Sequence, residues 1–131
     1  MSDAVTKQVI VVRSDLKMRR GKEVAQGAHA SGKWLRLRLR SVEDEMFGIA
    51  KLSLDEAAWL SGDQRKVCVR VRSEEELRDV WERARAAGLE AHLVTDIGLT
   101  EFRGVPTATA CAVGPVRADL VDEVTGGREL Y

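Results

Sequence analysis

The segment QVIVVRSDLKMRRGKEVAQGAH, residues 8–29, decides the fold class of this 131-residue chain. It opens with a β-branched run, Val9 to Val12, which is typical of a strand buried on both faces. From Gly21 onward the spacing is helical, so a loop joins the strand to a helix N-terminus. In open α/β sheets such loops bind ligands, and helix amides there favour anions. The loop carries five charged side chains: Asp15, Lys17, Arg19, Arg20 and Lys22.

A solvated basic turn between two core elements is the alternative interpretation of this loop, and charge alone favours that alternative. The helix that follows favours a site, because Lys22, Gln26, His29 and Lys33 fall at i, i+4, i+7 and i+11. This spacing places four polar side chains on one stripe of the helix. An apolar stripe lies beside it, made of Val24, Ala28, Leu35 and Leu39.

Charge is distributed unevenly along the chain, although the net charge is zero. Residues 1–40 hold ten Lys or Arg and three Asp or Glu, which gives a net charge of +7. The remaining residues hold eleven Lys or Arg and eighteen Asp or Glu, which gives a net charge of −7. This asymmetry indicates a polyanionic partner at the basic end. No apolar run approaches the roughly 20 residues of a membrane span, and no secretory signal is visible. Cys68 and Cys111 are predicted to be buried thiols in a reducing cytoplasm.

Local patterns predict the remaining helices and strands. The helix from Gly21 is expected to continue through WLRLRLR to Arg40, because no turn residues interrupt it. Two capping boxes, Ser53 with Glu56 and Ser73 with Glu76, each start a helix, and residues 117–124 form the last one. The other strands are expected at residues 66–72, 90–95 and 107–113, the last stopped by Gly114-Pro115.

This order of elements predicts one domain, residues 1–131, with a three-layer α/β/α fold around a mixed four-stranded sheet. Helical crossovers join parallel strands, whereas the last two strands lack a helix between them and are expected to pair antiparallel. Asp96 follows a buried strand, so parallel neighbouring strands would bring Asp96 and Lys17 to one edge of the sheet. Taken alone, Asp96 would more often cap a loop, and Thr107 and Thr109 would form a polar strand face.

Several blocks in this order resemble the type 2 peptidyl-tRNA hydrolase family. They are VVRSDLKM, GK and AQ…HA, then KVCVRVRSEEEL, then D-x-G-x-T followed by T-x-T-x-x-A-V-G-P, and the closing VTGG. The resemblance covers nearly the whole chain, and only residues 36–64 are longer than expected. It implies an α/β/α fold, commonly dimeric, that hydrolyses the ester between a peptide and the 3′-terminal ribose of tRNA. It also implies that no metal or organic cofactor takes part.

By this resemblance the catalytic residues are Lys17, Asp96, Thr100 and His29. Ester hydrolysis needs an acceptor that orients water and a donor where the carbonyl oxygen becomes negative. Asp96 is the expected acceptor, directly or through Thr100, and Lys17 the expected donor. His29 orients either group, although a lone helical histidine more often serves a structural hydrogen bond. Residues implied in substrate binding are Arg19, Arg20, Lys22, Gln26, Thr107 and Thr109, and Arg36 to Arg40 are further candidates for holding tRNA phosphates.

The chain departs from the family pattern near this site. Arg19-Arg20 stands where the family typically has glycine-lysine, and Leu99 and Glu101 stand where it has arginine and glutamine. The changes at 99 and 101 remove one positive charge and add a negative one. They leave two alternatives open: a member of the fold that binds RNA or another partner without hydrolysing this ester, and a hydrolase of a different acylated substrate.

Overall fold

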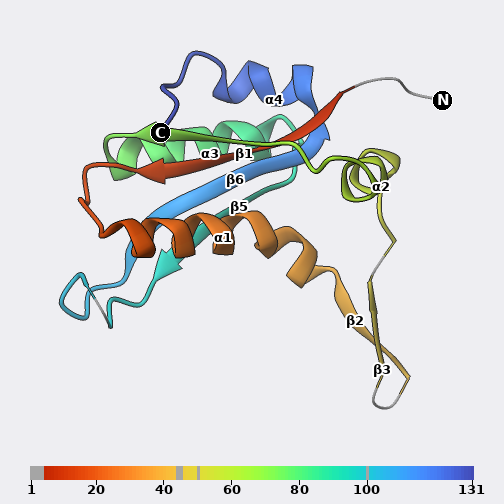
Figure 1. The fold of residues 1–131 in the computed structure, drawn as a ribbon, viewed down its shortest axis with the longest axis horizontal. Coiled ribbons are helices and arrows are strands. Elements are labelled where there is room, and N and C mark those ends of the chain that lie inside the picture. Colours follow the sequence, from red (N-terminus) through yellow and green to blue (C-terminus); the bar gives the residue numbers. More distant parts are fainter. Residues whose placement is uncertain (1–4, 44–45, 50, 100) are drawn as a thin grey trace.

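The computed structural model describes residues 5–43, 46–49, 51–99 and 101–131. The main sheet has four strands in the order β4-β1-β6-β5 (Figure 1). Strand β1 pairs parallel with β4 and antiparallel with β6, and β6 pairs antiparallel with β5. The predicted mixed four-stranded sheet is therefore confirmed. Its strands are β1 (Thr6–Arg13), β4 (Lys66–Val71), β5 (Ala91–Asp96) and β6 (Thr107–Arg117).

Helices cover both faces of this sheet (Figure 1). Helix α1 (Arg20–Leu37) lies on one face, and α3 (Glu74–Ala86) and α4 (Ala118–Thr125) lie on the other. Alternate residues of β1 enter different cores, because successive strand side chains point to opposite faces. Val9 and Val11 pack beneath α3 and α4. Val12 packs beneath α1 with Met18 and Ala30, which explains why the apolar run is continuous.

Capping residues start two helices where the sequence predicts them. At α2 (Leu54–Ser61), Ser53 Oγ accepts from the Glu56 amide at 3.0 Å and the Glu56 carboxylate accepts from the Ser53 amide at 2.8 Å, a complete capping box. At α3, Ser73 Oγ accepts from the Glu76 amide at 3.0 Å. The Glu76 carboxylate instead lies 3.4 Å from Arg128 Nη1. The second box is thus half formed, although the helix begins as predicted.

The prediction of a helix through Arg40 is wrong. Helix α1 ends at Leu37, and the chain continues into an antiparallel hairpin of β2 (Leu39–Glu43) and β3 (Met46–Ile49). Figure 1 shows this hairpin projecting away from the main sheet. The alternation in WLRLRLR was a strand signal in its second half. Arg38, the C-cap residue, binds Glu56 of α2 and Glu90 before β5, so the helix ends where long-range ion pairs hold the chain.

The prediction that Gly114-Pro115 stops the last strand is also wrong, because β6 continues to Arg117. The β1–β6 register shifts between Lys7 and Val9, opposite this dipeptide. Gly114 has a φ of 96°, and a Cβ there would lie 2.6 Å from the Lys7 carbonyl oxygen. A bulge that requires glycine therefore carries the strand past a dipeptide that usually ends one. In the described part of the chain, no helix has the length and apolar character to cross a membrane.

Candidate active site

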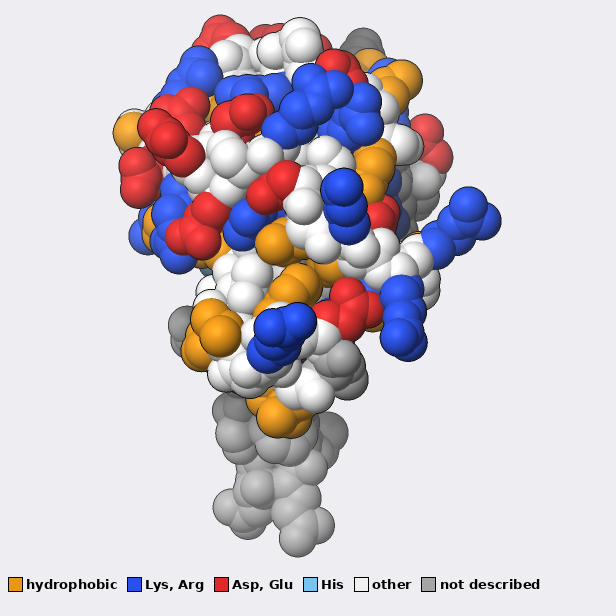
Figure 2. All heavy atoms as spheres, turned by 90° about the vertical axis from the view of Figure 1, so that its left-hand side faces the viewer, with side chains coloured by type: hydrophobic (Ala, Val, Ile, Leu, Met, Phe, Trp, Pro, Cys, Tyr) orange, Lys and Arg blue, Asp and Glu red, His pale blue; other side chains and the backbone are white. Residues whose placement is uncertain are grey.

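Strands β1, β4 and β5 end at one edge of the sheet, where the antiparallel β6 begins. Strand β6 separates β1 from β5, so the expectation that these two are neighbours is wrong. They nevertheless run in the same direction, and the expected shared edge is confirmed. The loops that follow them approach each other, since Arg19 Nε lies 3.9 Å from Glu101 Oε1. Figure 2 looks onto this edge and shows Lys and Arg side chains beside acidic ones.

Asp96, the last residue of β5, carries an ionised carboxylate at this edge. Lys22 Nζ donates to its Oδ1 at 3.0 Å, and the Gly98 amide donates to its Oδ2 at 3.0 Å. The bond from Lys22 is the main cause that lowers the pKa of Asp96 from 3.8; the Gly98 amide and the nearby charge of His29 act in the same direction, against burial. Asp96 is therefore charged at neutral pH and offers lone pairs as an acceptor.

Lys17 lies in the loop between β1 and α1, with a left-handed backbone (φ 51°) and an exposed side chain. The cation that pairs with Asp96 is thus Lys22. Arg13 anchors the loop: it is buried, donates to both carboxylate oxygens of Asp15 at 3.1 and 2.6 Å, and donates to the Ala108 carbonyl at 3.0 Å. Lys17 is therefore presented to solvent by a fixed loop. The sequence assigned no role to Arg13 and Asp15, although both lie within the VVRSDLKM block.

Three of the four residues on the polar stripe of α1 contact the sheet. Besides Lys22, Gln26 accepts from Thr109 Oγ1 at 2.5 Å, and Lys33 Nζ donates to the Leu93 carbonyl at 2.7 Å. His29 is exposed. The proposed apolar stripe does not form the core face, since Val24 is 67% exposed; the buried face is Gln26, Gly27, Ala30 and Trp34.

Two of the three predicted threonines are described, and these two differ in placement. Thr107 pairs with Asp96 in the β5–β6 register and donates to the Val105 carbonyl at 2.8 Å. Thr109 and its partner Gln26 are buried, so their hydrogen bond joins α1 to β6 beneath the site. The roles of Thr107, Thr109 and Gln26 in substrate binding stay predictions. Thr100 lies outside the described residues.

The loop after β5 closes on Gly98. This residue has a φ of 87°, its carbonyl accepts from the Gly104 amide at 2.8 Å, and a Cβ there would lie 2.6 Å from the Val105 oxygen. The closed loop leaves Leu99 81% exposed. It also places the Phe102 ring 5.8 Å from Lys22 Nζ, a contact that the sequence did not predict.

Much of the positive charge of residues 1–40 is neutralised within the fold. Lys7 pairs with Asp122, and Arg38 with Glu56 and Glu90, so Arg38 is not an open phosphate contact. Among the residues of this segment whose side chains the structure describes, the exposed cations that could meet a polyanion are Lys17, Arg19, Arg20 and Arg36. Among the described residues, no group of three or more His, Cys, Asp or Glu is placed to hold a metal ion.

A mixed sheet with helices on both faces places the protein in the α/β class, in which ligand sites usually lie at the carboxyl edge of the strands, where Asp96 and the lysines stand. Residues 6–131 match the family model described as peptidyl-tRNA hydrolase PTH2, and the chain belongs to this family. The resemblance inferred from the sequence blocks is confirmed.

Similar proteins carry the corresponding name. A peptidyl-tRNA hydrolase of Aeropyrum pernix is 44% identical over 126 residues, which cover 95% of each chain. A peptidyl-tRNA hydrolase of Methanocaldococcus jannaschii is 39% identical over 126 residues, 95% of this chain and 98% of that protein. A probable peptidyl-tRNA hydrolase 2 of Dictyostelium discoideum is 37% identical over 95% of this chain, which corresponds to 54% of that longer protein.

Proposed function

We propose that this protein hydrolyses the ester bond between a peptide, or an N-acylated amino acid, and the 3′ end of tRNA. Membership of the PTH2 family and the names of its relatives support this reaction. The observation that carries it is the ionised Asp96, held by Lys22 at the same sheet edge as the anchored loop that presents Lys17.

In the proposed reaction, Asp96 orients a water molecule whose oxygen attacks the ester carbonyl carbon. Lys17 donates a hydrogen bond to the carbonyl oxygen as it becomes negative. The bond between the carbonyl carbon and the ribose 3′ oxygen then breaks, the ribose oxygen takes up the proton that the attacking water loses, and the peptide leaves as its carboxylic acid. A carboxylate with a lowered pKa is a weak base, so Asp96 acts mainly by orientation and charge. Lys22 holds Asp96, and His29 and Thr100 are its further proposed partners.

We propose that tRNA phosphates contact the exposed cations Lys17, Arg19, Arg20 and Arg36, because phosphate contacts supply most of the sequence-independent affinity. Thr107 lies beside Asp96 and is the proposed threonine contact of the substrate. For the buried Gln26 and Thr109 we propose a supporting role, because their hydrogen bond fixes α1 on β6.

We further propose that residues 1–131 act as one domain, that the protein is a homodimer, and that it works in the cytoplasm, where translation produces its substrate. Exposed apolar side chains near the end of α1 and the start of α2 offer a surface for a second copy: Leu37, Leu39 and Leu54. Sedimentation of the wild type and of Leu54→Asp tests this; we expect a dimer that the substitution weakens.

The decisive experiment is release of peptide from a defined N-acetylated aminoacyl-tRNA by the purified protein. Asp96→Asn removes the charge that orients the water, so it should reduce turnover by roughly 10² to 10⁴, the range for a side chain positioned at the reacting group, with little loss of tRNA affinity. Lys17→Ala should reduce turnover and also weaken binding. Asp63→Asn, in an exposed turn, is the matched control.

The same assay separates the alternatives. A wild-type protein that binds tRNA but releases no peptide would be a non-catalytic member of the fold, and one that cleaves only another acylated substrate would be a divergent hydrolase. A folded Asp96→Asn protein with wild-type turnover would remove Asp96 from the mechanism. Melting temperatures of the same preparations show whether any loss of activity follows a loss of folded protein.

A further inference from the structure

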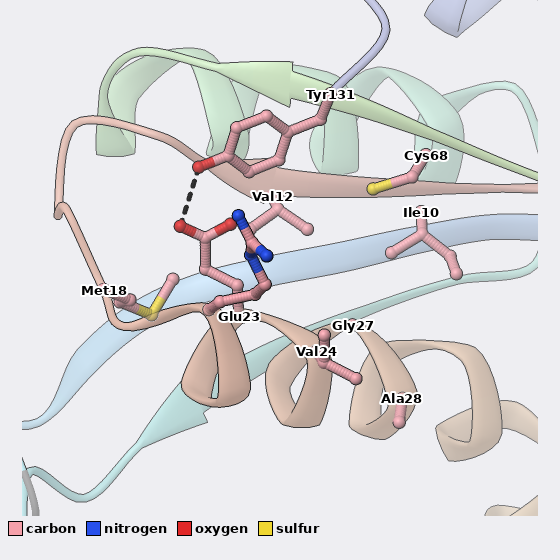
Figure 3. A pocket seen from close by; sticks show the side chains of 10 residues that line it. Ile10, Val12, Met18, Glu23, Val24, Gly27, Ala28, Cys68 and Tyr131 are labelled. Atoms are coloured by element: carbon pink, nitrogen blue, oxygen red, sulfur yellow. Dashed lines mark hydrogen bonds between the residues drawn. The ribbon is translucent and has the colours of Figure 1, made fainter.

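A groove of 780 Å³ runs along the side of α1 that faces β1 and β4. Figure 3 shows its walls: Ile10 and Val12 from β1, Cys68 from β4, Val24 and Ala28 from α1, and Tyr131 across the opening. Apart from Arg20 and Glu23, which carry opposite charges, its lining is uncharged. A groove of this volume and character suits an apolar ligand of moderate size.

Two residues that line the groove directly follow residues of the proposed active site in the sequence. Met18 lines one end and directly follows Lys17, while Glu23 lines it and directly follows Lys22, the partner of Asp96. Consecutive Cα atoms are about 3.8 Å apart, so a chain bound at the site can enter the groove without a long spacer.

A second groove, of 530 Å³, lies on the opposite side of α1, against β5. Its charged or titratable lining residues are His29, Lys33 and Arg36, and no acidic residue lines it. It ends at Val94 and Thr95, immediately before Asp96. Helix α1 therefore lies between an apolar groove and a basic one, which share Ala28 in their linings, and both reach the same sheet edge.

Resting on the proposed function, we propose that the apolar groove between α1 and β4 binds the peptide part of the substrate, while the tRNA lies on the basic side of α1. The charges of the two grooves match the two halves of the substrate, since the RNA is a polyanion and the peptide beside the ester is close to neutral. Apolar peptide side chains would cover Val24, which is 67% exposed in the free protein.

A peptide fits this groove better than a second copy of the chain does. A twofold interface places the same patch on both subunits, so a concave groove on the axis would face its own copy. Strand addition at β4 is closed as well, because residues 129–131 already follow this strand: the Tyr131 amide donates to the Cys68 carbonyl at 3.1 Å and the Arg70 amide to the Glu129 carbonyl at 2.9 Å. The groove thus receives side chains rather than a new strand.

One contact crosses the groove. The Tyr131 hydroxyl donates to Glu23 Oε1 at 2.8 Å, between the Met18 end and the Val24 end (Figure 3). This hydrogen bond is exposed to solvent, where water replaces it at little net cost. A bound peptide can therefore displace the Tyr131 side chain or lie beneath it.

The chain contains a probe for occupancy of this groove. Of its two cysteines, Cys68 lines the groove, whereas Cys111 is fully buried and burial raises the pKa of its thiol to about 12. Alkylation by iodoacetamide therefore reports on Cys68. Burial also raises the pKa of the Cys68 thiol, so the reaction is run at about pH 9, where more thiolate is present.

The test measures this alkylation rate with a stable substrate analogue: tRNA joined through an amide to N-acetylated tetraleucine. The rate follows the unoccupied fraction, so it should fall roughly tenfold when the analogue is present at about ten times its Kd. Deacylated tRNA should leave it unchanged. Val24→Gln should raise the analogue concentration that gives half-maximal protection of Cys68 by roughly tenfold, the usual effect of a disturbed apolar contact. Ala25→Gln, on the exposed outer side of α1, is the matched control and should behave as the wild type.

Other outcomes overturn the proposal. Unchanged alkylation with the analogue bound would place the peptide elsewhere, and equal protection by deacylated tRNA would place RNA in the groove. Protection that grows with protein concentration alone would show that a second copy covers it. Hydrolysis of N-acetyl-leucyl-tRNA is measured in parallel: protection of Cys68 without hydrolysis would contradict the proposed function but support the groove, and hydrolysis without protection would do the reverse.

Discussion

At Asp96, the hydrogen bond from Lys22 is the largest of several effects that favour the charged carboxylate. The bond from Lys22 lowers the pKa of Asp96 below 3.8, so the charge is present above that pH and is lost as the pH falls through the lowered value. We predict that kcat/KM for peptide release shows no loss from Asp96 protonation between about pH 5 and 8 and falls through this group only below about pH 4. A pH–rate profile measures this.

An acid limb near pH 6 would contradict this assignment. Repeating the profile with His29→Gln identifies its source, because His29 is the histidine whose charge acts on Asp96.

Glu101 and Leu99 are the two residues that make this edge less basic than the family pattern. Glu101 lies 3.9 Å from the exposed Arg19, so it neutralises one of the proposed phosphate contacts. Glu101→Gln should strengthen tRNA binding by roughly two- to fivefold, the range of an exposed ion pair, and Leu99→Arg should add to it. Kd values measured by filter binding decide this. The matched control is Glu82→Gln on α3; if the Glu101 and Leu99 variants bind like this control, the departures are neutral.

Among the elements, α1 depends on a distant ion cluster for its C-terminal end. Arg38 donates to both oxygens of Glu56 at 2.9 and 2.8 Å and also binds Glu90, which joins α1, α2 and the start of β5. Burial by itself would raise the pKa of Glu56, but the bonds from Arg38 and Ser53 outweigh it and lower the pKa below 4.5. Glu56→Gln should therefore cost about 1–3 kcal/mol of unfolding free energy at pH 7.

The pH dependence of this loss has a definite sign. Because the folded pKa of Glu56 is lowered, its contribution is present above about pH 4.5 and is lost as the pH falls through the folded value. The melting temperatures of the wild type and Glu56→Gln should thus converge between about pH 5 and 3. Glu75→Gln, exposed on α3, serves as the control, and a constant difference across this range would contradict the role of the Glu56 charge.

For the whole molecule, the net charge of +7 on residues 1–40 is a poor guide to the RNA-binding surface, because ion pairs within the fold neutralise much of this charge. Exposed cations remain at the site edge, and Arg19 and Arg20 stand there at the start of α1. Replacing both by alanine should weaken tRNA binding and reduce the slope of log K against log salt by roughly one to two. Arg83→Ala with Arg117→Ala, at the opposite end of the sheet, removes the same charge; an equal slope change in both pairs would show that the effect is not local.

The sequence by itself determined what depends on neighbouring residues. The β-branched run at Val9–Val12 predicted the buried strand, Ser53 and Glu56 predicted the start of α2, and ordered blocks predicted the family. These features follow from side-chain periodicity and from hydrogen bonds within one turn, which local sequence encodes.

Tertiary structure decided the features that depend on distant partners. Strand β6 lies between β1 and β5, the chain after Leu37 turns into a hairpin where Arg38 meets Glu56 and Glu90, and Lys22 rather than Lys17 pairs with Asp96. The sequence places several lysines and arginines in the loop after β1 and in the helix that follows, and each carries a positive charge that could pair with Asp96. Only the docking of α1 on the sheet brings one of them within hydrogen-bonding distance, and no local spacing specifies that placement.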